Sequence, residues 1–480
     1  MNLGEERISE VVRRVVEKIS KDPSLPLANA RTEARECRGL GVFQTINDAV
    51  AAAKAAFGTL ESQPLAVREK VLAAVRSAAL SGAETLAKMA VAETGLGRVD
   101  HKIQKNVLAA TKTPGIEILR TSAQTGDHGL TLTEHAPYGV IGCITPCTNP
   151  TATIINNAIG MIAGGNSIVV NAHPTAREVT LFVISLLNEA AMAAGGPANL
   201  ISTVEKPTIA TAGELMRHAD VALLVVTGGP GVVKAAMASA KKVIAAGPGN
   251  PPVVVDETAD LPAAAKHIVD GASFDNNIVC ILEKEIIAVE SIADRLSAEL
   301  AKNGAYLLNQ HQVRRLEKIL VESAPSGNGG HGAVNKEWVG KDAREILKRI
   351  DADAKPGVRL LVADLPKDHP FVQMELSTPV VGLVRVKNVN AAIGAAIEVE
   401  HGFRHTAVMH SRNIENLSAM AQAVDSSIFV KNGPSLAGIG FGGEGHTSFT
   451  IASPTGEGLT TAVNFTRERR CTLMDSFRII

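Results

Sequence analysis

The pattern of apolar and polar positions changes along the chain. Residues 8–20, ISEVVRRVVEKIS, carry apolar side chains at spacings of three and four, which predicts a helix with one apolar stripe and a charged opposite face. Pro23 and Pro26 then interrupt the pattern, so a linker is predicted over residues 21–30. From 48 to 97, long Ala-rich stretches of helical periodicity predict packing helices.

A different pattern begins at Tyr138, where short β-branched runs alternate with helical stretches. The first cycle is a predicted strand at 140–146 followed by a predicted helix at 151–165. Such alternation predicts a parallel sheet with helices on both faces, and ligands bind such sheets at the carboxyl ends of the strands. A second alternating region, 283–433, predicts a second α/β domain.

Composition narrows the class of protein. The chain has 480 residues, 45% of them hydrophobic and 20% charged, which is typical of a soluble globular protein with two or three domains. Lys and Arg number 48 against 49 Asp and Glu, so no net field favours nucleic acid or an anionic membrane. Because no apolar run approaches the roughly 20 residues that cross a bilayer, we expect no membrane insertion.

The five cysteines are an odd, scattered set in a chain without a secretory signal, which predicts a reducing cytosol. Cys143 and Cys147 lack a second pair or a His cluster, so no zinc site is expected. Cys280 ends the stretch FDNNIVC and has no metal-ligand partner at suitable spacing, so it is a candidate nucleophile. The alternative is an ordinary packed thiol.

Glycine-rich turns suggest where a phosphate could bind. Thr227–Gly231 lies between a predicted strand and a predicted helix, so its amides could cradle a phosphate, although such turns also occur for backbone reasons alone. Other strand ends carry Thr145–Pro150 and Asn171–Pro174. Gly438–Gly443 matches the dinucleotide-binding spacing, but no helix pattern follows it, and we reject it as the cofactor loop.

Six stretches, in order along the chain, resemble the aldehyde dehydrogenase superfamily. They are NPTATIINNA, VTGGPGVVKAA, AAGPGNPPVVVDETA, FDNNIVCILEKE, MELSTPVVG and GGEGHTSFTIASPTGEGLTTA. Within the superfamily they are most similar to the CoA-acylating branch, the propionaldehyde and acetaldehyde dehydrogenases of bacterial microcompartments. The resemblance implies an α/β fold with a Rossmann-type cofactor domain, an α/β catalytic domain and a small β oligomerisation arm.

The resemblance also implies residue roles. Cys280 would attack the aldehyde, and Asn149 with the Cys280 amide would stabilise the alkoxide of the thiohemiacetal. Hydride transfer to NAD, with NADP not excluded, would leave a thioester, and Glu375 would bind the nicotinamide ribose. The cofactor-binding residues implied are Thr145, Pro146, Asn171, His173, Thr227, Gly228, Gly229, Gly247 and Glu375. The substrate pocket implied comprises Ile278, Val279, Ile281 and residues near 434–441, with no metal.

Departures from the superfamily pattern predict the product. Hydrolytic members carry a water-activating glutamate where this chain has Ala246, so coenzyme A is the expected acyl acceptor and acyl-CoA the product. Ser377 replaces a phenylalanine near the nicotinamide, and the lysine that usually reaches the ribose is missing near Asn171. A short aldehyde is expected, with propanal favoured over acetaldehyde. The alternatives are a hydrolytic NAD(P)-dependent enzyme and a noncatalytic microcompartment assembly protein on the same scaffold.

His401 and His405 have the spacing of helical metal ligands, but no acidic partner follows, and we interpret them as structural. Residues 1–20 are predicted to dock to a microcompartment shell or core protein, the alternative being a helix folded back on its own domain. The enzyme is expected in the cytoplasm, inside a microcompartment, as a homodimer or homotetramer. The predicted domains are dinucleotide-binding at 31–125 and 139–251, catalytic at 252–445, and the arm at 126–138 and 452–480.

Overall fold

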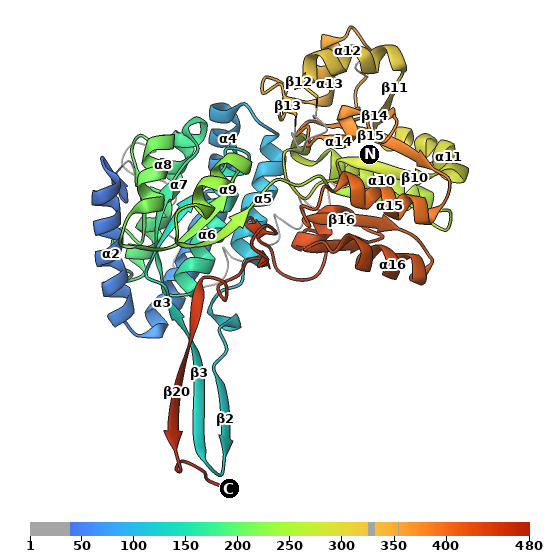
Figure 1. The fold of residues 1–480 in the computed structure, drawn as a ribbon. Helices are drawn as coiled ribbons and strands as arrows, with labels where there is room; N and C mark the ends of the chain where they lie inside the picture. Colours follow the sequence, from blue (N-terminus) through green and yellow to red (C-terminus); the bar gives the residue numbers. More distant parts are fainter. Residues whose placement is uncertain (1–38, 325–331, 354) are drawn as a thin grey trace.

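The computed structural model describes residues 39–324, 332–353 and 355–480. Two α/β bodies lie side by side, and a narrow β arm projects from them with the C-terminus at its tip (Figure 1). The helix predicted over 1–20 and the linker over 21–30 lie outside the described residues.

The Ala-rich stretch folds into helices that pack on the first body. Thr45 caps the first helix, because its Oγ1 accepts a hydrogen bond of 3.1 Å from the amide of Asp48. Gly95 ends the third helix of this stretch with φ of 69°, a conformation that glycine adopts without strain. The helices are α2 (Ile46–Ser62), α3 (Leu65–Ser81), α4 (Ala83–Thr94) and α5 (Val99–Lys112).

The first body is built on a six-stranded parallel sheet in the order β1-β6-β5-β4-β7-β8. Its strands are β1 (Val42–Phe43), β4 (Val140–Ile144), β5 (Ser167–Asn171), β6 (Ile201–Val204), β7 (Val221–Thr227) and β8 (Lys242–Ala246). Its helices are α6 (Pro150–Ala163), α7 (Arg177–Ala193), α8 (Ile209–Arg217) and α9 (Pro230–Met237). After β4 the chain adds β5 and β6 on one side and later β7 and β8 on the other. The carboxyl end of β4 is therefore the switch point at which such sheets bind ligands.

The second body is built on a seven-stranded parallel sheet in the order β11-β14-β15-β10-β9-β16-β17. Its strands are β9 (Pro252–Val255), β10 (Glu285–Val289), β11 (Ala305–Leu308), β14 (Leu360–Asp364), β15 (Val380–Val386), β16 (Thr406–His410) and β17 (Ile428–Lys431). Its helices are α10 (Leu261–Ala272), α11 (Glu290–Lys302), α12 (Gln310–Leu320), α13 (Ala343–Arg349), α14 (Pro370–Gln373), α15 (Val389–Val399) and α16 (Ile414–Val424). The central strand β10 is buried along its whole length, as expected of a sheet covered on both faces.

The arm is a three-stranded antiparallel sheet in which β3 (Gly129–Pro137) lies between β2 (Ser122–Gly126) and β20 (Thr466–Met474). Two small strand pairs complete the described strands: β12 (Val321–Ser323) with β13 (Ala333–Val334), and β18 (Ile451–Ala452) with β19 (Gly458–Leu459).

The predicted α/β fold with two parallel sheets is confirmed. In the part of the chain that the structure describes, no helix combines the length and apolarity needed to cross a bilayer.

Candidate active site

A pocket of about 790 Å³ lies at the carboxyl ends of β4, β5, β7 and β8. It runs from the Gly-rich turn after β7 to the loop that carries Cys280. The pocket brings together every site residue predicted from the sequence: Thr145, Pro146, Asn149, Asn171, His173, Thr227, Gly228, Gly229, Gly247, Ile278, Val279, Cys280, Ile281 and Glu375. Thr145 and Glu375 are 230 positions apart in the chain and do not meet by local folding, so this convergence is a property of the tertiary structure.

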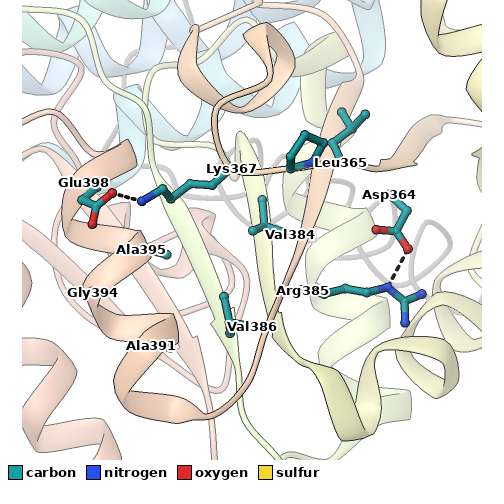
Figure 2. A pocket seen from close by; sticks show the side chains of 11 residues that line it. Asp364, Leu365, Lys367, Val384, Arg385, Val386, Ala391, Gly394, Ala395 and Glu398 are labelled. Carbon is teal, nitrogen blue, oxygen red and sulfur yellow. Dashed lines mark hydrogen bonds and ion pairs between the residues drawn. The ribbon is translucent and has the colours of Figure 1, made fainter.

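A second hollow, of about 710 Å³, lies at the carboxyl ends of β14 and β15 (Figure 2). Its charges are paired across it, with Lys367 contacting Glu398 and Arg385 donating to Asp364 over 2.6 Å. Among the residues that the structure describes, none of the predicted site residues and no cysteine lines this hollow. Its lysine and carboxylates are tied up in these ion pairs, so we place the chemistry in the first pocket, which holds Cys280.

The cofactor end of the first pocket has the features of a dinucleotide site. β7 ends at Thr227 and α9 begins at Pro230, so the turn between them sits at a helix N-terminus, which favours a phosphate. Gly228 is required there, because a Cβ would lie 2.6 Å from Cγ1 of Val232. Oγ1 of Thr145 is buried without a hydrogen-bond partner, so a polar group can still be bound beside it. These residues fit a nicotinamide dinucleotide.

The loop before Cys280 is strained and firmly held. Asp275, Asn276 and Asn277 have φ values of 46°, 54° and 65°, a left-handed run that Asp and Asn tolerate better than other side chains. Hydrogen bonds fix the strained backbone: Nδ2 of Asn276 donates to the Gly340 carbonyl over 2.9 Å, and Nδ2 of Asn277 donates to the Ala272 carbonyl over 2.7 Å. Strain that is held by surrounding contacts is common at functional sites. Here it delivers the sulfur atom of Cys280 to the pocket.

The surroundings of Cys280 keep its thiol protonated at rest. Burial, and after it the charge of Glu375, raise the pKa of Cys280 to about 12, while the charge of Lys284 opposes the shift. Because the thiolate is the nucleophile, the reaction requires removal of this proton.

Lys284 is a site residue that sequence reasoning missed. Its buried Nζ donates to the Asn277 carbonyl over 2.8 Å and lies 3.7 Å from Oε1 of Glu375. Glu375 also accepts a hydrogen bond of 3.4 Å from the Gly249 amide. Lys284 therefore links the cysteine loop to Glu375. The sequence did contain a sign of this role. Lys284 stands at the start of an apolar strand, and a lysine that is buried there needs a buried partner for its charge.

A sequence profile of the aldehyde dehydrogenase family matches residues 41–464. The chain belongs to this family. An acetylating acetaldehyde dehydrogenase of Salmonella typhimurium is 50% identical over the full length of both chains. The resemblance proposed from six sequence motifs is thereby confirmed.

Two solved structures of aldehyde dehydrogenases are also similar. A propionaldehyde dehydrogenase from the Clostridium phytofermentans fucose utilisation bacterial microcompartment matches with a TM-score of 0.89 at 47% identity, covering 92% of this chain and 100% of the other. A Rhodopseudomonas palustris propionaldehyde dehydrogenase, with bound CoA and an acylated cysteine, matches with a TM-score of 0.87 at 48% identity. That match covers 91% of this chain and 98% of the other.

The remaining pocket wall includes two positions at which the sequence departs from the superfamily pattern, Ala246 and Ser377. Ala246, at the end of β8, is 3% exposed and lines the pocket. Glu375 is the pocket's sole carboxylate among the described residues. Ser377 also lines the pocket, with φ of 51°. Within the predicted wall region 434–441, Ile439 reaches the pocket.

Cys147 reaches the pocket from the strand end Thr145–Pro150, whereas other wall residues were not identified from the sequence: Ile209, Ser448, Phe449 and Ile451. His405 does not line this dehydrogenase's pocket. It is buried behind Gly249, where a Cβ would lie 3.0 Å from the imidazole Cγ. Burial lowers the pKa of His405 to about 4, so it is neutral.

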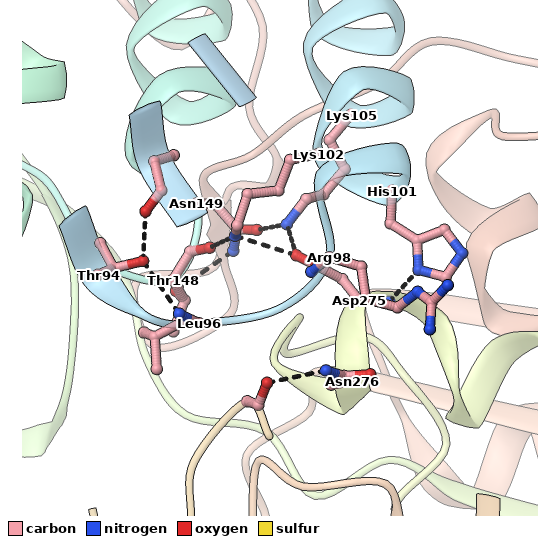
Figure 3. A network of polar contacts seen from close by, with 12 residues as sticks. Thr94, Leu96, Arg98, His101, Lys102, Lys105, Thr148, Asn149, Asp275 and Asn276 are labelled. Carbon is pink, nitrogen blue, oxygen red and sulfur yellow. Dashed lines mark hydrogen bonds and ion pairs between the residues drawn. The ribbon is translucent and has the colours of Figure 1, made fainter. Parts of the chain in front are cut away.

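Asn149 receives its main contact from helix α5. Its Oδ1 accepts a hydrogen bond of 2.5 Å from Nζ of Lys105, and Lys105 also contacts the carboxylate of Asp275 (Figure 3). Lys102 lies one turn earlier on the same helix and is equally buried. Sequence analysis gave these lysines no role. Their spacing in the sequence could have revealed their burial, because Lys102 and Lys105 lie on the same face of α5 as the buried Ala109.

Proposed function

We propose that this chain is a CoA-acylating aldehyde dehydrogenase that converts an aldehyde, coenzyme A and NAD(P) into acyl-CoA and NAD(P)H. The observation that carries the proposal is one pocket in which Cys280 and Asn149 face a glycine-rich turn, with Ala246 in place of a second carboxylate. The similar proteins named acetylating, or found with CoA and an acylated cysteine, support the same chemistry.

The residues divide the first half of the reaction between them. The Cys280 thiol loses its proton to solvent water, and the sulfur adds to the carbonyl carbon to give a thiohemiacetal alkoxide. The side-chain amide of Asn149 and the backbone amide of Cys280 donate to that oxygen and stabilise its charge. Bound nicotinamide supplies the hydride acceptor. As the C–H electron pair leaves the substrate, the alkoxide becomes the carbonyl of a thioester on Cys280.

The second half releases the acyl group. The thiolate of coenzyme A adds to the thioester carbonyl, and the Cys280 thiolate leaves as the new thioester forms. Water attacks slowly, because Glu375 is held by Lys284 and the Gly249 amide and Ala246 supplies no base. Acyl-CoA is therefore the product. The apolar lining from Ile278, Val279 and Ile281 suits a short aliphatic aldehyde, with propanal favoured over acetaldehyde.

Steady-state measurement of NADH formation tests the proposal. With propanal and NAD, sustained turnover is expected only when CoA is added, and acyl-CoA should equal NADH in amount. Cys280→Ser should lower kcat by at least about 10³-fold, because a serine hydroxyl is a far weaker nucleophile here. Cys471→Ser, on the exposed arm, is the matched control. Equal turnover without CoA would make the chain a hydrolytic enzyme, and inactivity in both conditions would favour an assembly protein.

The proposal extends to partners and location. Residues 1–20 dock to a shell or core protein, which places the enzyme inside a bacterial microcompartment of the cytoplasm. The amphipathic pattern of that segment and the microcompartment origin of a similar structure support this placement. The chain forms a homodimer or homotetramer through the arm, where β2 and β20 leave open strand edges suited to pairing.

A further inference from the structure

A buried ionic cluster lies beside the proposed oxyanion site. It consists of the carboxylate of Asp275, which is fully buried, and the ammonium groups of Lys102 and Lys105 (Figure 3). The side chains of these lysines are 2% and 3% exposed. Two cations around one carboxylate leave an excess positive charge, which is costly to bury unless another polar group receives it.

The side chain of Asn149 is the polar group that accepts a hydrogen bond from this cluster. Nζ of Lys105 donates to Oδ1 of Asn149 over 2.5 Å, whereas Lys102 donates to the backbone carbonyl of Thr148 over 2.9 Å. In its charged form, the ammonium group of Lys105 has donors and no acceptor, so it can bind only the oxygen of the amide. This contact fixes which way the Asn149 amide faces. Its Nδ2 makes one long contact, 3.3 Å to Oγ1 of Thr148, and keeps an N–H free for a ligand.

Asp275 connects this arrangement to the nucleophile. Its Oδ1 accepts a hydrogen bond of 2.7 Å from the Arg98 amide, and its own amide donates to Nδ1 of His101 over 2.8 Å. It also begins the left-handed run that leads to Cys280. The same carboxylate therefore anchors Lys105 and the cysteine loop. Burial lowers the pKa of Lys105 to about 7, and the charge of Asp275 opposes that shift.

We propose that Lys105 is a positioning residue that holds the Asn149 amide with Nδ2 toward the reacting oxygen, and that Asp275 keeps Lys105 in place beside the Cys280 loop. This inference rests on the proposed function, because it assigns Lys105 a part in stabilising the same alkoxide. A charged partner on Oδ1 also polarises the amide, which makes Nδ2 a stronger donor.

A double-mutant cycle tests the assignment. Lys105→Met removes the donor while keeping a chain of similar length, and kcat should fall by about 10²–10³-fold, as when one oxyanion donor is lost. KM for the aldehyde should change by less than about threefold. In the Asn149→Ala background, Lys105→Met should cost less than about threefold more, because both changes act through one amide. Losses that multiply instead would overturn the proposal.

A control variant at Lys112 and further variants at Lys105 distinguish the positioning role of Lys105 from a contribution to stability alone. Lys112 lies on the same helix and donates to the carbonyls of Gly440 and Gly443, so Lys112→Met should keep kcat within about threefold. Lys105→Ala should regain activity with added ethylamine at constant melting temperature, whereas ethylamine should leave the rate of Lys112→Ala unchanged. If Lys105→Met fails to fold, Lys105→Gln supplies a neutral donor and should retain an intermediate kcat.

A crystal structure of Lys105→Met gives a readout independent of turnover. The Asn149 side chain should rotate or occupy two conformers, and an unchanged Asn149 would contradict the inference. If the wild type lacked CoA-dependent turnover but Asn149 still moved in the variant, the proposed function would fail while the positioning role survived.

Discussion

At the residue scale, the site combines groups that the sequence reveals with groups that it hides. Cys280 and Asn149 could be predicted because their surrounding motifs resemble a family, and both line the pocket. Lys105 and Lys284 could not be predicted, because a lysine is usually solvated and only tertiary packing buries these two. The buried cations nevertheless set the local electrostatics of the nucleophile and of its oxyanion site.

The raised pKa of Cys280 predicts a steep pH dependence of its alkylation. The thiolate reacts with iodoacetamide, and burial raises the pKa of Cys280 from 9.0 to about 12. Protonation therefore dominates through the neutral range, and the rate should rise about tenfold per pH unit from pH 7 to pH 10. Mass spectrometry of the labelled peptide measures the rate at Cys280 alone. A plateau below pH 9 would contradict the prediction.

Glu375→Gln is the matched variant for this experiment. Glu375 is the second cause of the raised pKa of Cys280, after burial. Removing its negative charge should lower that pKa and speed alkylation of Cys280 at pH 8. Exposed Cys471 gives the internal reference, because its rate should be the same in both proteins.

At the scale of elements, periodicity predicted the helices and strands, but it could not give their order across the sheets. The predicted strand at 140–146 forms β4, which ends at Ile144, as expected of a β-branched stretch before a helix. Strand β2 was missed, since SAQTG is polar and exposed and has no alternating pattern. The side of β4 on which each later strand pairs depends on crossovers and helix packing, which no single stretch encodes.

Strand β8 offers a direct test of why acyl-CoA is released. Its last residue, Ala246, lines the pocket, and the resemblance to the superfamily aligns it with the water-activating glutamate of hydrolytic members. Ala246→Glu should permit turnover without CoA at about 10²-fold above the wild type, because a general base activates water. Liquid chromatography of the free acid measures the product. Ala246→Gln has similar volume without a base, and its CoA-independent rate should stay at the wild-type level. Equal rates in both variants would show that space, rather than a base, limits hydrolysis.

At the scale of the whole molecule, the pocket and the predicted docking segment occupy separate parts of the chain. Every residue that lines the pocket lies between positions 144 and 451, and the predicted docking segment precedes position 21. The domain boundaries assigned from the sequence remain a prediction. The role of β3 and β20 in forming an oligomer also remains a prediction.

Removing residues 1–38 should separate the two functions. The chain 39–480 should keep kcat within about twofold, because the sheets and the pocket lie within it. In cells that assemble microcompartments, it should no longer co-sediment with them, whereas a fluorescent protein fused to residues 1–38 should do so. Continued co-sedimentation of the truncated enzyme would argue against the docking role.

The size of the pocket has a consequence for the cell. At about 790 Å³, it has the volume of a cleft for one medium-sized ligand, yet the proposed reaction needs a dinucleotide and then coenzyme A near the same sulfur atom. Excess CoA would then compete with the dinucleotide for the free enzyme, and excess dinucleotide would compete with CoA for the thioester form. The rate of acyl-CoA formation should depend on the ratio of dinucleotide to coenzyme A. Confinement of these two molecules with the enzyme would make that ratio adjustable.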